Sequence, residues 1–280
     1  CHNCARFGSA IGRRHPGKRP REMTQVEVPR IFVHSLPGWI PAGSLRGGVA
    51  IVVDVLRATT VMAHALAAGC REIIPCAEIE EARAVATCVP EGTSLLAGER
   101  GGLPIEGFDL GNSPEEFTPE VCLDKTIVMT TTNGTRAILA SLEAEHVYVA
   151  GFVNLSATVD EILVQFLKKD RRPAIHIVCA GSEGRPASED DLLAGALADR
   201  LAARSFDLLV SNGSMTLEDH ERIVLGDESP PTPASRALMD WRLAQGPSQQ
   251  RTVLERLRES DGGTRLDQIG READVVAASK

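Results

Sequence analysis

Hydrophobic positions along this chain fall into two patterns, one typical of buried strands and the other of amphipathic helices. The clearest strand pattern is the apolar run at residues 49–53, which ends at Asp54. Uninterrupted runs of this kind are typical of strands that are covered on both faces, as in parallel sheets. Shorter runs predict further strands at residues 31–33, 71–75, 94–97, 126–129, 146–150, 175–178 and 274–278.

Amphipathic segments separate these strands. Thr59 or Thr60 can cap a helix that runs to Ala68, and Gly69 supplies its C-terminal stop. Strands that alternate with helices predict an α/β fold with mainly parallel sheets between helices, in a three-layer α/β/α arrangement. From Phe206 onward helices dominate, so we expect a helical C-terminal part. The other predicted helices cover residues 78–88, 136–142, 157–168 and 188–203.

One segment, residues 98–114, has neither helical nor strand periodicity. It contains five glycines and two prolines, together with the apolar side chains of Leu103, Ile105, Phe108 and Leu110. Long loops without secondary structure are uncommon in compact domains unless they bind something or are disordered. Disordered linkers tend to lack apolar anchors of this kind. We therefore expect an ordered, glycine-shaped loop that belongs to a functional site.

Residues 1–25 differ from the rest of the chain. They are rich in Arg, Gly and Pro, lack hydrophobic periodicity, and carry six Lys/Arg against Glu22 alone. We predict that this segment is a disordered or mistranslated N-terminal extension. Met23 would be a sensible start for the protein that follows it. Residues 26–280 are expected to form one domain or two intertwined α/β halves.

Charge and composition exclude several classes of function. The formal net charge is −8, and the cationic N-terminal segment leaves the remainder still more acidic, so nucleic acid is a poor partner. No apolar run approaches the roughly 18 residues of a membrane helix, so no membrane partner is expected. The seven cysteines are scattered, and four of them stand in apolar or amphipathic contexts that are typical of reduced, buried cysteines. We therefore expect a cytoplasmic protein. A homodimer is the default expectation for the assembly.

Candidate chemistry gathers in four loops that each follow a predicted strand, at residues 54–60, 98–114, 130–135 and 179–185. Ligands collect beyond the carboxyl ends of parallel strands, and three of these loops run into helices whose free N–H groups attract anions. Each loop contains or precedes an arginine, whose guanidinium group matches phosphate or sulfonate oxygens. Arginines interleaved with carboxylates predict an anionic substrate together with Mg²⁺ held by oxygen. These residues are Arg57, Arg100, Arg136 and Arg185, with Asp54, Glu99, Glu106, Asp109, Glu183, Glu189 and Asp190.

Two other interpretations remain open. Cys179 and Arg185 stand six positions apart in a loop between a strand and a helix, as in phosphatases that use a thiolate nucleophile. Glu183 opposes this interpretation, because a carboxylate there would repel phosphate and raise the thiol pKa. A non-catalytic sensor of phosphorylated or sulfonated metabolites would use the same anion-binding loops.

Several segments of the sequence match a known family. They are residues 52–59, 98–102, 107–114, 131–135 and 179–181, with Glu189-Asp190. Together they resemble the 2-phosphosulfolactate phosphatase family, and the likeness extends in order from about residue 30 to about residue 275. Membership would imply Mg²⁺-dependent hydrolysis of 2-phospho-3-sulfolactate to 3-sulfolactate and phosphate, in the route to coenzyme M. Where the family usually has a Ser-x-His-Gly segment, this chain has Glu259-Ser260-Asp261-Gly262-Gly263, so sulfonate recognition can differ here.

On this basis residues 26–280 form a phosphatase domain, and roles can be assigned within it. Asp54 is expected to be either a Mg²⁺ ligand or the attacking carboxylate. Glu99 and Asp109 would complete the metal coordination or act as general base. Arg57 and Arg100 would bind phosphate and stabilise charge on its equatorial oxygens. The other expected substrate-binding residues are Thr59, Asn133, Gly134, Thr135, Gly181, Ser182 and Arg185.

Overall fold

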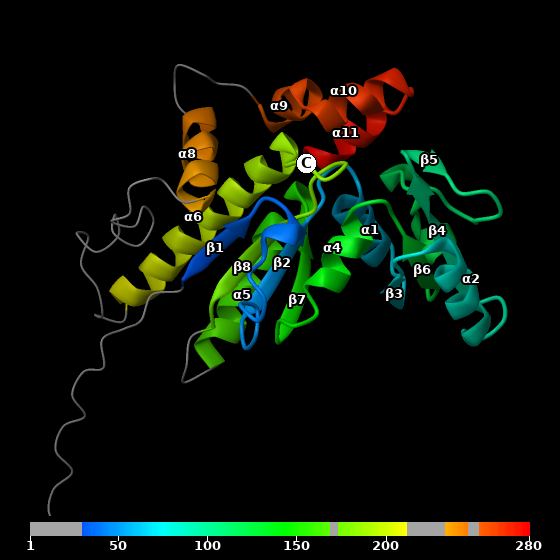
Figure 1. Cartoon of the computed structure of the whole chain (residues 1–280), viewed down its shortest axis with the longest axis horizontal. Coiled ribbons are helices and arrows are strands. Elements are labelled where there is room, and N and C mark those ends of the chain that lie inside the picture. The colour runs from blue at the N-terminus through cyan, green and yellow to red at the C-terminus, as the bar shows by residue number, and fades with distance from the viewer. Residues whose placement is uncertain (1–29, 169–172, 212–232, 246–251) are drawn as a thin grey trace, which may run out of the picture.

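The computed structural model describes residues 30–168, 173–211, 233–245 and 252–280 (Figure 1). The prediction for residues 1–25 lies outside these described residues. Within them, one four-stranded sheet is entirely parallel and has the order β1-β8-β2-β7. Its strands are β1 (Ile31–His34), β2 (Val49–Val53), β7 (His146–Ala150) and β8 (Ile175–Cys179).

The second sheet has the order β3-β6-β4-β5, in which only the short β5 is antiparallel to its neighbour. Its strands are β3 (Glu72–Pro75), β4 (Ser94–Arg100), β5 (Leu103–Pro104) and β6 (Thr126–Thr130). Strands of the two sheets are interleaved along the chain, because β3 to β6 fall between β2 and β7. Each sheet is therefore completed by segments that are distant in sequence.

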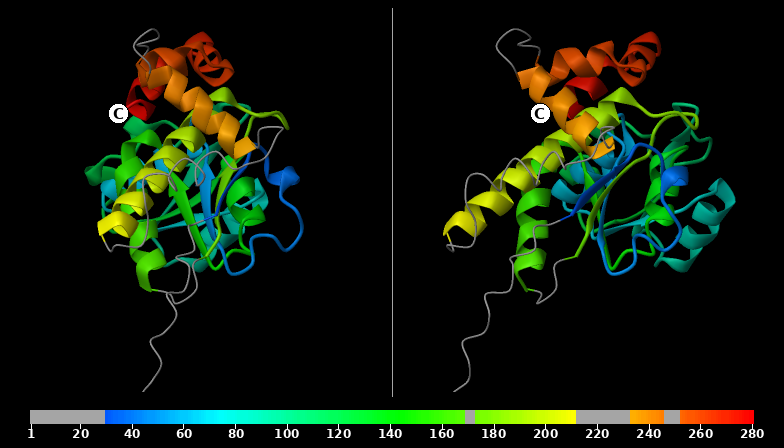
Figure 2. Two further views of the ribbon diagram at one scale, coloured as in Figure 1. Left: turned by 90° about the vertical axis from the view of Figure 1, so that its left-hand side faces the viewer. Right: turned by 60° about the vertical axis from the view of Figure 1, so that its left-hand side comes forward.

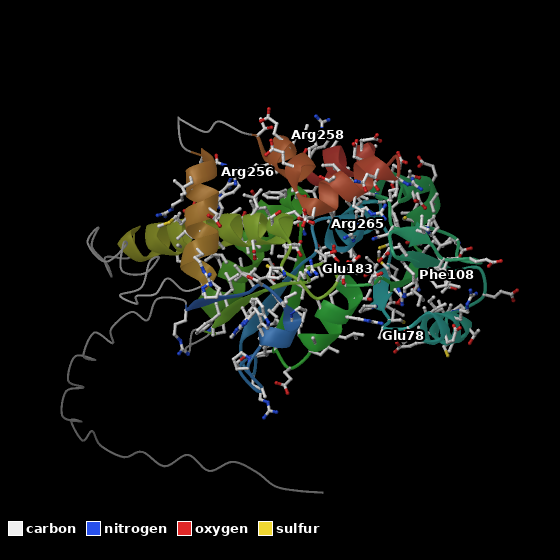
Figure 3. All side chains as sticks on the ribbon, turned by 45° about the horizontal axis from the view of Figure 1, so that its top comes forward. Glu78, Phe108, Glu183, Arg256, Arg258 and Arg265 are labelled. Atoms are coloured by element: carbon white, nitrogen blue, oxygen red, sulfur yellow. The ribbon has the colours of Figure 1, made fainter. Side chains whose placement is uncertain are left out.

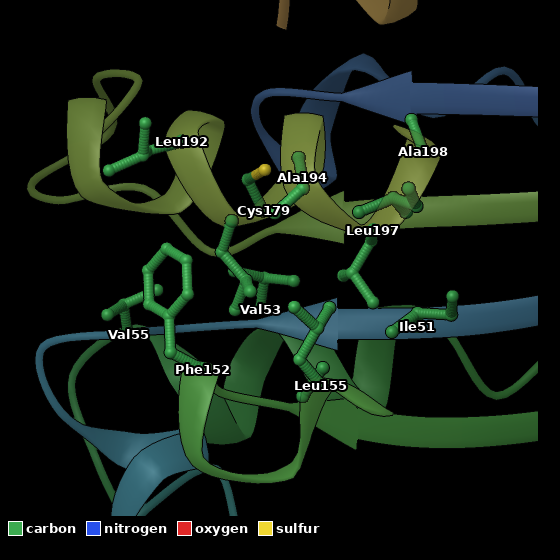
Figure 4. Close-up of a cluster of buried hydrophobic side chains, with 14 of the residues drawn as sticks. Ile51, Val53, Val55, Phe152, Leu155, Cys179, Leu192, Ala194, Leu197 and Ala198 are labelled. Atoms are coloured by element: carbon green, nitrogen blue, oxygen red, sulfur yellow. The ribbon is translucent and has the colours of Figure 1, made fainter. Parts of the chain in front are cut away.

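Side chains alternate along the strands so that helices cover both faces of each sheet. Ile51 and Val53 of β2 pack with α5 (Leu155–Lys168) and α6 (Ser188–Ser211), as Figure 4 shows. Val52 points the other way, into a cluster that α1 (Ala58–Ala67) and α4 (Gly134–Ala140) share with β6. Helix α2 (Ile79–Cys88) covers the outer face of the second sheet.

The predicted fold class is confirmed by this arrangement: mainly parallel sheets lie between helical layers, and the described C-terminal part is helical. The helices α1 and α4 serve both sheets, which the alternation of elements along the chain did not indicate. None of the described helices combines the length and the apolar composition that a membrane span requires.

The C-terminal helices α9 to α11 pack together over one end of the strands (Figures 1 and 2). The prediction of a strand at residues 274–278 is wrong, because these residues form α11. Val275 and Ala278 are both buried and stand three positions apart, which is a helical spacing. A short apolar run cannot distinguish the two patterns. The helices are α8 (Pro233–Gln245), α9 (Val253–Glu259), α10 (Asp261–Gln268) and α11 (Glu272–Ala278).

The segment 98–114 is more regular than predicted. Strand β4 continues through Arg100 and pairs with β5, and a 3₁₀ turn begins at Pro114. Gly98 permits this continuation because its φ is +148° and an added Cβ would overlap the Thr130 carbonyl of β6. The remaining residues are ordered by backbone bonds such as the one from the Asp109 N–H to the Leu96 carbonyl, 2.9 Å.

Candidate active site

The loops that follow β2, β4, β6 and β8 meet at one pocket, which α10 closes from the opposite side. All four loops singled out in the sequence contribute to its lining. Within each sheet the parallel strands bring their carboxyl ends to one edge, β2 with β8 and β4 with β6, and the pocket lies where the loops from these two edges meet. The lining residues are Asp54, Leu56, Arg57, Glu99, Gly101, Gly102, Asn112, Thr132, Asn133, Gly181, Ser182, Glu183, Ala187, Glu189, Asp190, Gly262, Arg265, Leu266 and Ile269.

Asp54 directly follows β2, and its carboxylate is held by a backbone N–H of α1, the next helix in the chain. Its Oδ1 accepts a hydrogen bond of 3.2 Å from the Ala58 N–H at the start of α1. Its other oxygen faces the start of α4, where an added Cβ on Gly134 would lie 2.7 Å from Oδ2. Burial, assisted by repulsion from the nearby carboxylates of Glu99 and Glu189, raises the pKa of Asp54 to about 7, although the Ala58 N–H and Arg57 act in the opposite direction.

Glu99 joins two of the loops. Its carboxylate accepts hydrogen bonds of 2.7 Å from the N–H groups of Gly102 and Thr132, and it is almost fully buried. Thr132 also donates its hydroxyl to Glu99, at 3.1 Å. Glu99 therefore fixes the β4–β5 turn against the loop after β6 while it lines the pocket.

Asp190 and Glu189 enter the pocket from the first turn of α6. Asp190 accepts from the N–H groups of Val55 (2.9 Å) and Gly181 (3.0 Å), and so ties the loops after β2 and β8 together. Burial raises the pKa of Asp190 well above its usual range, and repulsion from Asp54 and Glu189 adds to the shift. Burial also raises the pKa of Glu189.

This carboxylate cluster predicts that the free energy of unfolding falls as the pH rises from about 4 to about 7. The unfolded Asp54 loses its proton near pH 3.8, whereas the folded group keeps it until about pH 7. Over that window the unfolded chain binds fewer protons, so the folded state loses relative stability. Urea denaturation in EDTA measures the effect, and Asp54→Asn should show a shallower fall. Stability that rises across this window would contradict the assignment.

Arg57 is the one predicted arginine that lines the pocket. Its Nη1 donates 2.7 Å to Oδ2 of Asp274 on α11, and its Nη2 donates 3.0 Å to the Gly102 carbonyl. Both partners of this ion pair are almost fully buried. Asp274 in turn accepts from the Ser113 hydroxyl. The C-terminal helix therefore fixes the position of the guanidinium group.

Several other predicted site residues lie outside the pocket lining. Arg100 donates to the Glu99 and Ala77 carbonyls and to Thr130, and Asp109 accepts 2.8 Å from the Leu96 N–H. Arg136 forms an exposed ion pair with Glu78.

Two predicted threonines are also structural. Thr59 is fully buried and its hydroxyl lies 2.6 Å from the Ala150 carbonyl, while the Thr135 hydroxyl bonds to the backbone of Thr131. Asn133, Gly181 and Ser182 do line the pocket, whereas Gly134 approaches Asp54 without being part of the lining.

The interpretation that uses a Cys179 thiolate finds no support in the geometry. Cys179 is fully buried in the core cluster between β2 and α6 (Figure 4), and burial raises its pKa well above the usual value. The following loop is a tight turn in which Glu183 and Gly184 both have positive φ. Arg185 is exposed and bonds to Ser182 through its backbone. The thiol and the guanidinium group therefore do not face a common space.

The sequence did not indicate that α10 lines the pocket. The residues Gly262, Arg265, Leu266 and Ile269 follow a helical spacing that could have placed them on one face. Nothing in that spacing shows that this face turns toward the loop after β8. Glu189 and Asp190 were noted as carboxylates, but the sequence assigned them no role.

Comparison with known proteins decides the family. A model of the 2-phosphosulpholactate phosphatase family matches residues 35–280, which is most of the chain.

The chain belongs to this family.

Its curated relatives carry the name "Probable 2-phosphosulfolactate phosphatase". The relative from Caldanaerobacter subterraneus subsp. tengcongensis is 44% identical over 151 residues, which cover 54% of this chain and 60% of that protein. The relative from Caldicellulosiruptor saccharolyticus is 40% identical over 171 residues, with 61% and 69% covered. The relative from Prochlorococcus marinus is 39% identical over 178 residues, with 63% and 71% covered. The chain thus spans about two thirds of the length of the family members that it matches.

Proposed function

We propose that the protein is a phosphomonoesterase that hydrolyses 2-phospho-3-sulfolactate to 3-sulfolactate and phosphate with the help of Mg²⁺. Family membership supports the reaction class. The observation that carries the proposal is the pocket itself, where Asp54, Glu189 and Asp190 meet the buried guanidinium group of Arg57. We further propose that this step serves the route to coenzyme M, as the family resemblance implies. We place it in the cytoplasm, since the five described cysteines are all free.

The donor set fits a hard divalent cation. Burial raises the pKa values of Asp54, Glu189 and Asp190, three of the carboxylates that line the pocket. Repulsion from neighbouring carboxylates adds to the shifts of Asp54 and Asp190, and a cation would relieve it. Among the described residues no three acidic, histidine or cysteine side chains form a preassembled metal site. This is compatible with Mg²⁺, which commonly uses one or two carboxylates and completes its shell with water and substrate oxygens. When bound, the ion would neutralise charge on the phosphoryl group.

Hydrolysis forms a bond between a water oxygen and phosphorus while the bond from phosphorus to the ester oxygen breaks. The water loses a proton and the leaving oxygen gains one. Arg57 supplies a fixed positive charge for the phosphoryl oxygens, because Asp274 and Gly102 determine its position. Asp54, with a pKa near neutrality, is suited to hold the cation or to accept the water's proton. Helix α10 lines the side of the pocket opposite the strand-end loops, where Gly262, Arg265 and Leu266 face the substrate.

Removal of divalent ions tests this proposal directly. Phosphate release from 2-phospho-3-sulfolactate is expected to fall by about 10²-fold or more in EDTA and to return with added Mg²⁺. Cys179→Ala should keep the EDTA-sensitive activity. Activity that resists EDTA but is lost in Cys179→Ala would instead establish thiolate chemistry. Thermal stabilisation by the substrate without any phosphate release would establish a sensor.

A further inference from the structure

The pocket contains far more negative than positive charge, although the proposed substrate is itself an anion. Among the described residues two arginines and no lysine line it, so these two side chains are the cationic groups that the described part of the pocket offers to an anionic substrate. The cations are Arg57 and Arg265, and the carboxylates are Asp54, Glu99, Glu183, Glu189 and Asp190.

Arg57 cannot serve more than one part of the substrate. Its Nη1 and Nη2 are bound to Asp274 and to the Gly102 carbonyl, and the residue is 6% exposed. The guanidinium group is therefore held at the strand ends, next to Asp54, and it cannot follow a second anionic group elsewhere in the pocket.

Arg265, in contrast, is exposed and is not fixed by a buried partner. It reaches the pocket from α10, where its Nη1 lies 3.4 Å from Oε1 of Glu183 and 3.3 Å from the Ser182 hydroxyl (Figure 3). Its side chain is 46% exposed and that of Glu183 is 72% exposed. Exposed pairs of this kind contribute little to stability and are screened by salt, so an incoming anion can replace Glu183 as the partner.

The backbone around Arg265 is well anchored, although about half of its side chain is exposed. Ser260 caps α10 by accepting 3.0 Å from the Gly263 N–H, and Leu266 is buried in the main core cluster. Gly262 allows α10 to approach α6 closely, because an added Cβ would overlap the carboxylate of Glu189. The partner loop is equally defined, since Ser182 and Arg185 close a two-residue turn with paired backbone bonds of 2.8 and 2.9 Å.

We propose that Arg265 is the specificity-determining residue of this pocket and binds the substrate's anionic group that is not the phosphate, either the sulfonate or the carboxylate. On substrate entry its guanidinium group exchanges Glu183 for that group. The inference rests on the proposed function and adds to it the residue that selects the substrate. Neither the arginines noted in the sequence nor the strand-end loops include this position.

Three phosphomonoesters separate the roles of Arg265. They are 2-phospho-3-sulfolactate, 2-phospholactate, which lacks the sulfonate, and isopropyl phosphate, which lacks both remote acids. For Arg265→Gln, kcat/KM on 2-phospho-3-sulfolactate is expected to fall about 30-fold, mainly through KM, because charge-assisted hydrogen bonds are lost. Isopropyl phosphate should change by less than about twofold. A loss on 2-phospholactate assigns Arg265 to the carboxylate, and no loss there assigns it to the sulfonate.

Two control variants accompany this experiment. Arg271→Gln removes a neighbouring arginine that lies outside the pocket, where its Nη1 is 3.6 Å from Oε1 of Glu115. This variant should leave kcat/KM unchanged for all three substrates. Glu183→Asn removes the competing carboxylate and introduces asparagine, which tolerates the positive φ at this position. The KM for 2-phospho-3-sulfolactate should therefore fall. An equal loss on all three substrates in Arg265→Gln, or no loss on any, overturns the inference.

A binding measurement keeps the inference separate from the proposed function. If the wild-type protein hydrolyses none of the three esters, the proposed function fails. Calorimetry with 3-sulfolactate and with lactate, with and without Mg²⁺, then decides the role of Arg265. We expect the affinity for 3-sulfolactate to be about 30-fold weaker in Arg265→Gln and unchanged in Arg271→Gln. Equal affinities in the wild-type protein and Arg265→Gln would exclude the role.

Discussion

Replacement of Asp54 by Asn is expected to lower the rate of phosphate release by about 10³-fold or more while the fold is retained. The amide has the size of the carboxylate, and its oxygen can still accept the hydrogen bond from the Ala58 N–H. The negative charge that would hold a cation or accept a proton is lost. Because that charge is buried among like charges, its removal should also raise the melting temperature above pH 7.

Asp109→Asn is the matched control for this variant. The sequence predicted both aspartates as metal ligands, but Asp109 lies outside the pocket and accepts from the Leu96 N–H. Activity of Asp109→Asn measured at saturating Mg²⁺ should remain near the wild-type value, and its circular dichroism spectrum should be unchanged. If Asp109→Asn were inactive and Asp54→Asn active, the roles given to the two residues would have to be exchanged.

The fold followed from the sequence because its signals are local. The apolar run at residues 49–53 lies in a strand with parallel neighbours on both sides and helices on both faces, as the pattern predicted. The parallel strands β2 and β8 are direct neighbours, although 126 positions separate Val53 of β2 from its partner Cys179 of β8. The periodicity of hydrophobic positions predicts which residues are buried, but it does not predict which strands pair.

The site was predictable only where it belongs to strand ends. Parallel pairing brings Asp54 and Arg57 to the same edge as Gly181 and Ser182, and it brings Glu99 to the same edge as Asn133. That the edges of the two sheets face one pocket did not follow from the sequence. Arg100 and Asp109 carry suitable charges in the right segment, but both bind backbone groups elsewhere. Arg100, at the end of β4, donates to the Ala77 carbonyl, and Asp109, in the loop after β5, accepts from the Leu96 N–H. These contacts depend on how the segment folds back onto β4, which its many glycines concealed.

The contribution of the C-terminal helices could not be predicted from composition. Asp274 stands in an apolar run that resembled a strand, yet it is the buried counterion of Arg57 across 217 positions of sequence. Such a contact depends on how α11 is placed over the strand ends. Only the three-dimensional arrangement shows that α10 and α11 complete a pocket whose other walls are strand-end loops.

Asp274→Ala is expected to lower the free energy of unfolding by about 3–5 kcal/mol, because it leaves the buried guanidinium group of Arg57 without a counterion. The Ser113 hydroxyl loses its acceptor in the same variant. Chemical denaturation measures this loss. Asp267→Ala on the exposed side of α10 is the control and should change stability by less than about 0.5 kcal/mol. A comparably small effect of Asp274→Ala would mean that the Arg57–Asp274 pair does not hold the C-terminal helices in place.

The double variant Arg57→Met, Asp274→Leu separates stability from catalysis. Replacing both members of a buried ion pair by apolar residues removes two desolvated charges together, so most of the stability lost in Asp274→Ala should return. Phosphate release should not return, because Arg57 is the fixed positive charge beside Asp54 and methionine cannot replace it. Recovery of stability without recovery of kcat would establish that Arg57 is needed for phosphate release and not only for the fold. Recovery of both would show that this ion pair serves the fold alone.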